Sequence, residues 1–203
     1  GRVASALDLD LVFASRTLDP LILRSTELGL RNGHVPVTAI NTLISLVHAA
    51  SDGADAVVLA NERSSSADTI PGINHQYSKS LAFERLLRAA LTTNVPDTFS
   101  ALRPWGDLAI ARAFVTRTSL LGDFMSCNRA FLRDPARRSD GWCGRCDKCR
   151  SVYLSLAPFT TPDVLAGVFG RDLLADVDAE TVDGFRRLVV DSDKPFDCVA
   201  DVA

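Results

Sequence analysis

The 203-residue sequence lacks an apolar stretch of the ~18–20 residues that a helix needs to cross a bilayer, and its opening, GRVASALDLD, lacks the architecture of a signal peptide. It also lacks an excess of basic charge, because 22 Lys and Arg stand against 25 Asp and Glu. A general binder of nucleic acid or of membrane surfaces needs a net basic face to neutralise phosphates. We therefore expect a cytoplasmic protein whose partners are neither nucleic acid nor membrane.

Cysteine is scarce, and four of the five cysteines are gathered in one stretch. They are Cys127, Cys143, Cys146 and Cys149. Without an export signal, such a cluster favours a metal site over a disulfide framework. Four thiolates satisfy a tetrahedral zinc ion and leave no position open for water, so we predict a structural zinc site. The alternative is an iron–sulfur cluster, although Tyr153 occupies the position where a ferredoxin motif would continue with cysteine.

The surroundings of the cluster are basic. Residues between Arg129 and Arg150 form either a solvated loop or a rim that binds anions, and the sequence favours neither interpretation. The fifth cysteine, Cys198, stands alone near the end of the sequence and is expected to be an ordinary thiol.

The rest of the sequence alternates short apolar runs with helical patterns, and 47% of its residues are hydrophobic, so we expect a folded globular protein. Strands are predicted around Leu9–Ser15 and over Asp55–Asn61, and helices over Pro36–Ala50, Ser78–Leu91 and 106–121. This alternation indicates an α/β domain with a parallel sheet, which we place at residues 1–125. Further short helices are predicted over 149–159, 161–170 and Ala179–Val189. Together with the cysteines they form a helical subdomain, which we place at residues 126–203.

Polar residues follow the second predicted strand, in the segment NERSSSADTIPGINHQYSKS from Asn61 to Ser80. In open parallel sheets, ligands bind beyond the carboxyl ends of the strands, and a connection of this length favours a functional loop. Lys79 stands at the start of a predicted helix, where a cation is unfavourable unless an anion lies near it. We therefore expect this loop to meet a phosphate or a carboxylate.

Three residues near the predicted strand ends have more than one interpretation. His75 either bonds to nearby backbone or acts as a general acid or base, which suits a side chain that gains and loses a proton near neutral pH. Glu62 is a solvated carboxylate, a metal ligand or a base. His34 lies just before the helix at Pro36–Ala50, where the helix dipole favours anions.

Several stretches together resemble one family. They are NGHVPVTAIN (Asn32–Asn41), LANERS (Leu59–Ser64), NHQYSKS (Asn74–Ser80), SCNRAF (Ser126–Phe131) and WCGRCDKCRSVYLSLAPF (Trp142–Phe159). They are similar to the bacterial UDP-N-acetylmuramoyl-L-alanyl-L-glutamate epimerases, over most of the span from residue 30 to about residue 175. The cysteine block also resembles that of the 7-cyano-7-deazaguanine synthases, which belong to the same nucleotide α-hydrolase superfamily and hold zinc with four cysteines.

The resemblance implies a parallel sheet of the nucleotide α-hydrolase type, here incomplete, with a C-terminal helical cap around a four-cysteine zinc site. It implies an enzyme of peptidoglycan precursor synthesis that uses ATP and Mg²⁺ to invert the terminal L-glutamate of a UDP-muramoyl dipeptide. AMP joined to the carboxylate would cancel its charge, so that a side-chain base can take the neighbouring α-proton. Hydrolysis would then release AMP.

The resemblance also implies roles for particular residues. The candidates for the proton-transfer pair are His34, Glu62 and His75. The residues expected to contact phosphates or the glutamate carboxylates are Arg63, Lys79 and Arg129. The residues expected to orient nucleotide or substrate are Asn61, Ser64, Asn74, Gln76 and Tyr77.

The sequence departs from the superfamily in one respect, because it has no Gly/Ser-rich phosphate loop of the S-G-G-x-D-S or G-G-G-K-D-S kind. The nearest runs, RSSSAD and RNGHVP, lack the glycines that let backbone amides cradle pyrophosphate. We therefore expect a carboxyl-terminal portion whose phosphate loop lies upstream of Gly1, and which binds ATP poorly alone. The alternatives are an ATP-dependent amide- or nitrile-forming ligase of the same superfamily, and a non-catalytic, zinc-stapled interaction module.

Overall fold

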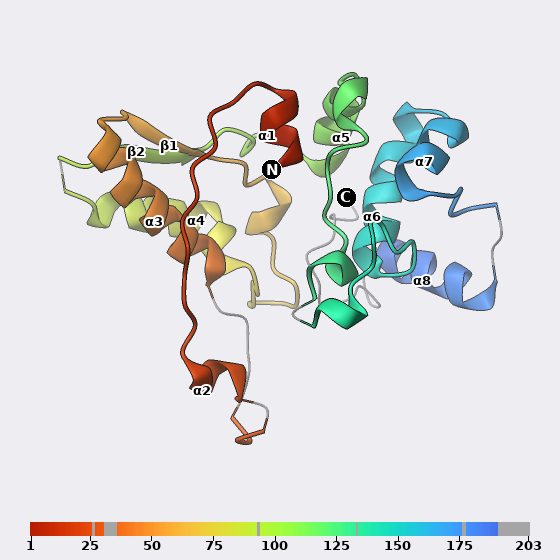
Figure 1. The fold of residues 1–203 in the computed structure, drawn as a ribbon, viewed down its shortest axis with the longest axis horizontal. Coiled ribbons are helices and arrows are strands. Elements are labelled where there is room, and N and C mark those ends of the chain that lie inside the picture. The colour runs from red at the N-terminus through yellow and green to blue at the C-terminus, as the bar shows by residue number, and fades with distance from the viewer. Residues whose placement is uncertain (26, 31–35, 93, 133, 176–177, 191–203) are drawn as a thin grey trace. The chain divides into compact units, whose positions relative to one another are not determined.

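A computed structural model describes residues 1–25, 27–30, 36–92, 94–132, 134–175 and 178–190. The chain divides into two compact units, shown in Figure 1. The cysteine unit comprises Gly1–Asp10 and Trp105–Ala203, and the sheet unit comprises Leu11–Pro104. In neither unit is any described helix long and apolar enough to span a bilayer. The predicted division after residue 125 stays a prediction.

The sheet unit has the predicted α/β character. Strands β1 (Ala56–Leu59) and β2 (Asp97–Ser100) pair in parallel, with Val57 opposite Thr98. Helix α3 (Val37–Asp52) precedes β1 and contacts it, and α4 (Leu81–Ala90) lies in the connection between the strands and contacts β2. The helices and the strand predicted in this region are therefore confirmed. That the sheet is of the nucleotide α-hydrolase type stays a prediction, because the described sheet has two strands.

Local signals explain where these helices begin and end. Helix α3 ends at Gly53, whose φ of 70° is the left-handed conformation that glycine adopts without strain. Helix α4 begins after Ser80, whose Oγ accepts a hydrogen bond from the backbone N–H of Phe83 at 3.1 Å. The long connection before α4 is folded by two short 3₁₀ helices, η1 (Ser64–Ser66) and η2 (Tyr77–Lys79).

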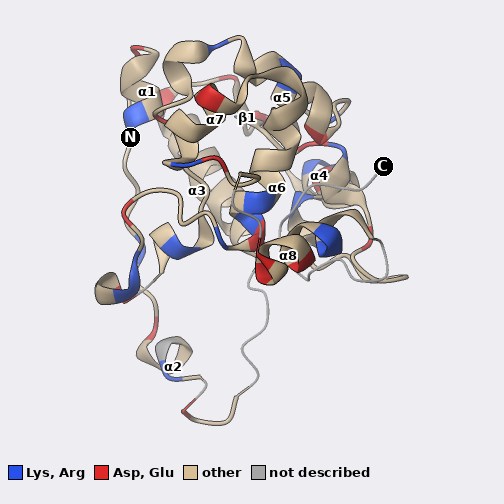
Figure 2. Cartoon of the chain, turned by 90° about the vertical axis from the view of Figure 1, so that its right-hand side faces the viewer, with Lys and Arg blue, Asp and Glu red and all other residues tan. Residues whose placement is uncertain are grey.

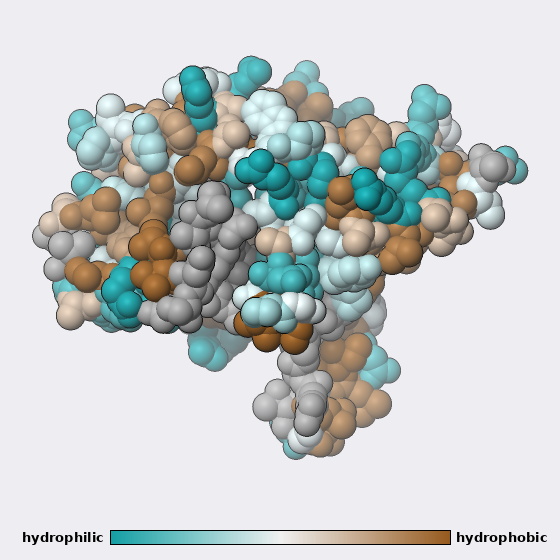
Figure 3. Space-filling model, turned by 180° about the vertical axis from the view of Figure 1, so that it is seen from behind, coloured by the Kyte–Doolittle hydropathy of each residue, from teal (hydrophilic) through white to brown (hydrophobic). Residues whose placement is uncertain are grey.

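The strand predicted around Leu9–Ser15 is wrong, because these residues form no regular structure. Leu9 is 60% exposed and Phe13 is 85% exposed. An apolar run becomes a buried strand only where a neighbouring strand and a covering layer receive it, and the division between the two units falls inside this run. The segment leads instead to the four-residue helix α2 (Pro20–Leu23). Apolar side chains in and around this helix are exposed, and Figure 3 shows them in brown at the bottom of the view.

The cysteine unit is helical, as predicted for the region after the cysteines. Its helices are α1 (Arg2–Ala6), α5 (Asp107–Val115), α6 (Asp147–Leu156), α7 (Pro162–Phe169) and α8 (Ala179–Val189). Shorter 3₁₀ helices are η3 (Thr118–Leu120), η4 (Asn128–Phe131), η5 (Pro135–Arg137) and η6 (Ala157–Phe159). Helix α6 contacts both α5 and α8 and so lies at the centre of the unit.

The core of the cysteine unit is apolar and continuous with the cysteine cluster. Tyr153, Leu165 and Phe169 are at most 4% exposed, and Cys127 and Cys149 are fully buried beside them. A row of aromatic rings also runs through this core, because ring contacts join Phe114 to Phe124 and Phe124 to Trp142.

A buried arginine joins helices α6 and α8. Arg150 is 4% exposed, and its guanidinium lies 3.6 Å from Asp147 and 3.8 Å from Glu180. Gly184 of α8 packs directly on this guanidinium, since a Cβ built there would lie 2.2 Å from the Arg150 Cζ. In the ribbon of Figure 2, acidic and basic residues are intermingled along α6 and α8.

Candidate functional site

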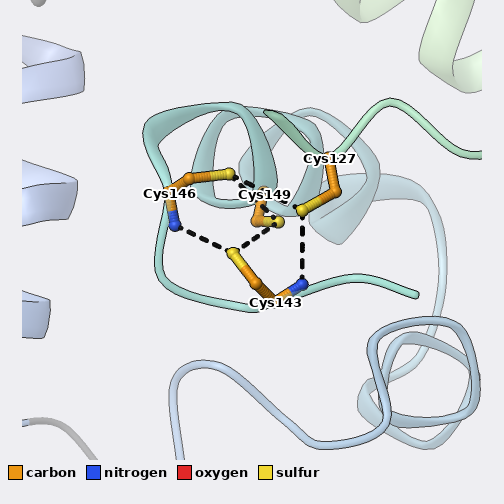
Figure 4. A group of neighbouring side chains, drawn as sticks. All are labelled: Cys127, Cys143, Cys146 and Cys149. Atoms are coloured by element: carbon orange, nitrogen blue, oxygen red, sulfur yellow. Dashed lines mark hydrogen bonds between the residues drawn. The ribbon is translucent and has the colours of Figure 1, made fainter. Parts of the chain in front are cut away.

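The four predicted metal ligands come together in the cysteine unit (Figure 4). Cys127 precedes η4, and Cys146 precedes α6, whose first turn carries Cys149. All four sulfurs lie within 4.8 Å of one another. The Sγ atoms of Cys146 and Cys149 are 3.4 Å apart, those of Cys143 and Cys149 are 3.7 Å apart, and those of Cys127 and Cys146 are 4.0 Å apart. A tetrahedral zinc ion with sulfurs at ~2.3 Å would hold them about 3.8 Å apart, so the cluster fits such an ion.

Backbone geometry holds two of the sulfurs in place. The N–H of Cys143 donates to the Cys127 sulfur, and the N–H of Cys146 donates to the Cys143 sulfur, both at 3.4 Å. The turn between them depends on Gly144, which has a φ of +68°. A Cβ on Gly144 would also lie 3.0 Å from Leu173 Cδ2, so a larger residue would disturb the turn that presents the ligands.

The pKa values of the four thiols are shifted in opposite directions, since those of Cys127 and Cys146 are lowered and those of Cys143 and Cys149 are raised. The hydrogen bond between Cys149 and Cys146 lowers the pKa of Cys146 to about 4, and the same bond raises the pKa of Cys149. Burial acts to raise the pKa of Cys127, but hydrogen bonds from Cys143 and Ser139 outweigh it and leave that pKa lowered. Thiolates are the species that bind metals, and a cation would take the place of the protons that the remaining thiols hold.

A second group of predicted residues lies where the two strands of the sheet unit end. Asn61 follows β1 by two residues, and its Nδ2 donates to the Oγ of Ser100, the last residue of β2, at 3.2 Å. Glu62 comes next and accepts a hydrogen bond from the Ser64 hydroxyl at 3.3 Å. Both residues are partly buried. The carboxyl ends of the parallel strands therefore carry an amide and a carboxylate, in the position where such sheets bind ligands.

The far end of the same loop folds back on its beginning. Asn74 Nδ2 donates to the carbonyl of Ser65 at 2.9 Å, and Asn74 Oδ1 accepts from the backbone of Gln76 at 2.7 Å. The Gln76 side chain in turn accepts a hydrogen bond from Lys79 Nζ at 2.7 Å. His75 is hydrogen-bonded to Thr69 through Nδ1. The polar loop, residues 61–80, is thus a closed structure held by its own side chains.

Arg103 is the residue that sequence reasoning missed. Its side chain is 13% exposed, and its guanidinium donates six hydrogen bonds of 2.8–3.4 Å. The acceptors are the carbonyls of Glu62 and Lys79, the hydroxyls of Ser65, Ser66 and Ser100, and the carboxylate of Glu84. Arg103 therefore joins the two ends of the polar loop to the end of β2. The position after a strand end could have indicated it, but the short, polar segment DTFS was not predicted to be a strand.

The other predicted residues lie apart from this network or outside the described residues. Arg63 is exposed at the start of η1, and Tyr77 is 47% exposed and packs edge-on against Phe83. Arg129 belongs to the cysteine unit, where it is exposed on η4 two residues after Cys127. His34 lies outside the described residues.

Comparison with known proteins identifies the family. A family model described as the MurL N-terminal domain matches residues 1–101, and one described as the MurL C-terminal domain matches residues 123–203. The sequence is also 44% identical, over 199 residues, to the UDP-N-acetyl-alpha-D-muramoyl-L-alanyl-L-glutamate epimerase of Micromonospora sp.. The chain belongs to this epimerase family.

Two further members of the epimerase family match to a similar degree. Those of Salinispora tropica and Xanthomonas oryzae pv. oryzae are 42% and 39% identical to the chain. These matches cover 93–98% of the chain but 43–45% of the relatives, so the chain spans less than half the length of the curated relatives it matches. No solved structure matches the chain.

Proposed function

We propose that the chain serves in the ATP-dependent inversion of the terminal L-glutamate of UDP-N-acetylmuramoyl-L-alanyl-L-glutamate. The family supports this proposal, because the curated relatives are named as epimerases of that substrate. The observation that carries it is the polar loop, which gathers Asn61, Glu62 and Lys79 at the carboxyl ends of two parallel strands. In open parallel sheets this is where nucleotides and their phosphates bind.

The chemistry requires the glutamate carboxylate to be neutralised before its α-carbon can lose a proton. An oxygen of the carboxylate next to that carbon attacks the α-phosphorus of ATP, and pyrophosphate leaves with the electrons of the broken P–O bond. The acyl-adenylate then gives its α-proton to a side-chain base, and a proton returns on the opposite face. Water finally cleaves the acyl bond and releases AMP, so each inversion consumes one ATP and one water.

The residue roles follow from position and chemistry. Glu62, His75 and His34 are the candidates for the proton-transfer pair, and Mg²⁺ would accompany the ATP phosphates. The cationic side chains proposed to meet phosphates or carboxylates are Arg63, Lys79 and Arg129. The side chains proposed to orient nucleotide or substrate are Asn61, Ser64, Asn74, Gln76 and Tyr77. The four cysteines would hold a structural zinc ion and leave it no open position for chemistry.

Loss of the α-deuterium from labelled UDP-muramoyl dipeptide tests the proposal. The assay uses the 203-residue chain and, in parallel, the full-length Micromonospora relative with matching substitutions, because the chain spans less than half of that relative. We expect wash-out that depends on ATP, and a loss of roughly 10²-fold or more when one of the proton-transfer pair is replaced. Glu62→Gln and His75→Gln are the test variants described by the structure, and His34→Gln completes the set.

Matched controls separate chemistry from folding. Asp68→Asn removes an exposed carboxylate from the same loop, and His48→Gln removes a partly exposed histidine from α3, so both should retain wash-out. Wild-type rates in all three test variants would contradict the assignment of the bases. Inversion without consumption of ATP would contradict the adenylate, and a new amide at unchanged stereochemistry would indicate a ligase instead.

A further inference from the structure

The cysteine unit contains a groove of about 890 Å³ beside the cysteine cluster. One side is formed by the first residues of the chain in α1, and another by α7. The remaining lining comes from the turn at Gly122 and Asp123 and from the segment that leads into the first C-x-x-C pair. A space of this size is sufficient for a ligand with one or two rings. The proposed function gives no role to this groove.

Two glycines leave bare backbone on the groove wall. A Cβ added to Gly122 or to Gly167 would meet no atom within 4 Å. Gly167 lies inside α7, where glycine is less favourable than alanine by roughly 1 kcal/mol. No close approach of a neighbouring residue requires it, unlike Gly184. The space at Gly167 is therefore open to solvent or to a ligand.

Aromatic rings lie along the same groove. Phe131 is 66% exposed, although it is a large apolar side chain. Trp142 lies between Phe124 and Phe169, with ring centroids at 5.2 and 4.8 Å, so its orientation is fixed by packing. An exposed aromatic ring such as that of Phe131 binds a flat ring by stacking, which is worth about 1–3 kcal/mol for a nucleic-acid base.

The charged side chains of the groove are two carboxylates and one guanidinium. The carboxylates of Asp123 and Asp140 line it, and Arg2 is the one basic side chain among the described lining residues. Carboxylates accept hydrogen bonds from sugar hydroxyls, as they do from ribose in dinucleotide sites. The groove therefore suits a flat ring that carries a hydroxylated sugar.

We propose that this groove binds a nucleoside, with its base stacked on the exposed Phe131 ring and its ribose hydroxyls bonded to Asp123 and Asp140. The inference rests on the proposed function, in which two ligands carry a nucleoside. One is the uridine end of the sugar nucleotide, and the other is the adenosine of ATP. Both combine a planar base with a ribose diol, and the experiment below distinguishes them.

Fluorescence of Trp142 measures the binding directly. The zinc-loaded 203-residue chain carries Trp105→Phe, which removes the other tryptophan and is not part of the groove. Uridine and adenosine are titrated separately, without phosphates and without turnover. We expect saturable quenching by one of them, with at least tenfold weaker binding of the other. Phe131→Ala should weaken the binding by roughly tenfold, the value of one stacked base.

Gly167→Leu is the decisive variant, because it fills the groove and also improves a helix. Leucine has a higher helix propensity than glycine, so the thermal midpoint should stay the same or rise while nucleoside binding falls at least tenfold. Asp123→Asn should weaken binding, whereas Asp163→Asn, which removes an exposed carboxylate of α7 outside the groove, should not.

Two results would overturn the inference: no saturable binding of either nucleoside, or equal binding by wild type and Gly167→Leu. Failure of the proposed function gives a different pattern. A chain that binds uridine but never washes out the α-deuterium would retain the groove assignment and reject the epimerase chemistry. Wash-out of the α-deuterium by a chain that binds neither nucleoside in this groove would reject the groove assignment and retain the epimerase chemistry.

Discussion

The two units of the chain fill their interiors with opposite kinds of side chain. In the cysteine unit the buried residues are mostly aromatic and aliphatic, and they continue into the cysteine cluster. Among the described residues of the sheet unit, the buried hydrophobic ones are Leu46 and Ala49. The buried polar ones are more numerous: Ser25, Thr42, Ser65, Ser80, Glu84, Thr98 and Ser100.

This difference changes what each unit depends on. Apolar burial is non-directional, so a core such as that of the cysteine unit resists the loss of any one contact, but its ligands must all be present to hold a metal. A polar interior is favourable only while every donor and acceptor has a partner. The sheet unit should therefore lose most stability when one of a few hydrogen-bonding residues is replaced, and the cysteine unit when its metal is removed.

The largest effect is expected from Cys149→Ala. The variant should lose its bound metal, about one equivalent in the wild type, and with it folding energy on the order of 10 kcal/mol. Both tryptophans belong to the cysteine unit, so a red shift of their fluorescence reports its unfolding. Hydrogen exchange in β1 and β2 should stay slow, because the sheet unit contains none of the ligands.

Chelation of the wild type should reproduce this result, and Cys198→Ala, at a residue outside those described, is the control that should retain the metal. If the strands of the sheet unit also exchanged rapidly in Cys149→Ala, the two units would not be energetically separate. The contrast between them would then fail.

Arg103→Met is expected to have the next largest effect, and to act on the other unit. It leaves the Glu84 carboxylate, which is 10% exposed, without its charged partner and removes five further hydrogen bonds. Breaking such a pair costs about 3 kcal/mol or more. Hydrogen exchange should accelerate through the polar loop and β2, while tryptophan fluorescence stays unchanged.

A double variant identifies the cause of that loss. Adding Glu84→Leu to Arg103→Met removes the unpaired carboxylate and should recover part of the stability. The surface pair of Arg88 and Asp97, whose side chains are about half exposed, is the control, and Arg88→Met should cost less than about 1 kcal/mol. Equal losses for Arg88→Met and Arg103→Met would show that burial of the network is unimportant.

The sequence predicted the cysteine cluster because its spacing is local. A C-x-x-C pair before a helix places two sulfurs near one point whatever the rest of the fold does. Cys127 was assigned to the same site because four of the five cysteines lie in one stretch of the sequence. The helix before β1 and the helix between the strands were likewise visible as helical patterns in the sequence.

Features that depend on distant partners could not be predicted. Arg103 reaches acceptors as many as 41 residues away in the sequence, and no local pattern distinguishes it from a surface arginine. The strand predicted over Leu9–Ser15 is an error of the opposite kind, a local pattern without the distant partner that it needs. Its composition fits a strand, but no neighbouring strand pairs with it among the described residues. Strand β2 was missed because its buried positions are Thr98 and Ser100, whereas Phe99 is 37% exposed.

Gly184→Ala should produce a smaller loss, confined to the cysteine unit. The added Cβ would collide with the buried Arg150 guanidinium, and such overpacking costs about 1–3 kcal/mol, partly offset by the better helix propensity of alanine. Gly167→Ala is the matched control, because it makes the same change inside α7 where space is open. Urea unfolding followed by tryptophan fluorescence should show Gly184→Ala destabilised and Gly167→Ala unchanged or stabilised. The reverse order would reject close packing between α6 and α8.

The smallest effects come from helix caps, and they compare the two interiors most directly. Ser80, which is 4% exposed, caps α4 in the sheet unit at 3.1 Å, whereas the exposed Thr161 caps α7 in the cysteine unit at 3.5 Å. Ser80→Ala should cost about 1–2 kcal/mol and Thr161→Ala about 0.5 kcal/mol, because the first leaves a partly buried backbone N–H without an acceptor, whereas the second leaves an exposed one. Hydrogen exchange of the first turn of each helix measures both. Equal losses of stability would mean that the sheet unit does not depend on its buried hydrogen bonds more than the cysteine unit does, and the contrast between the two interiors would then fail.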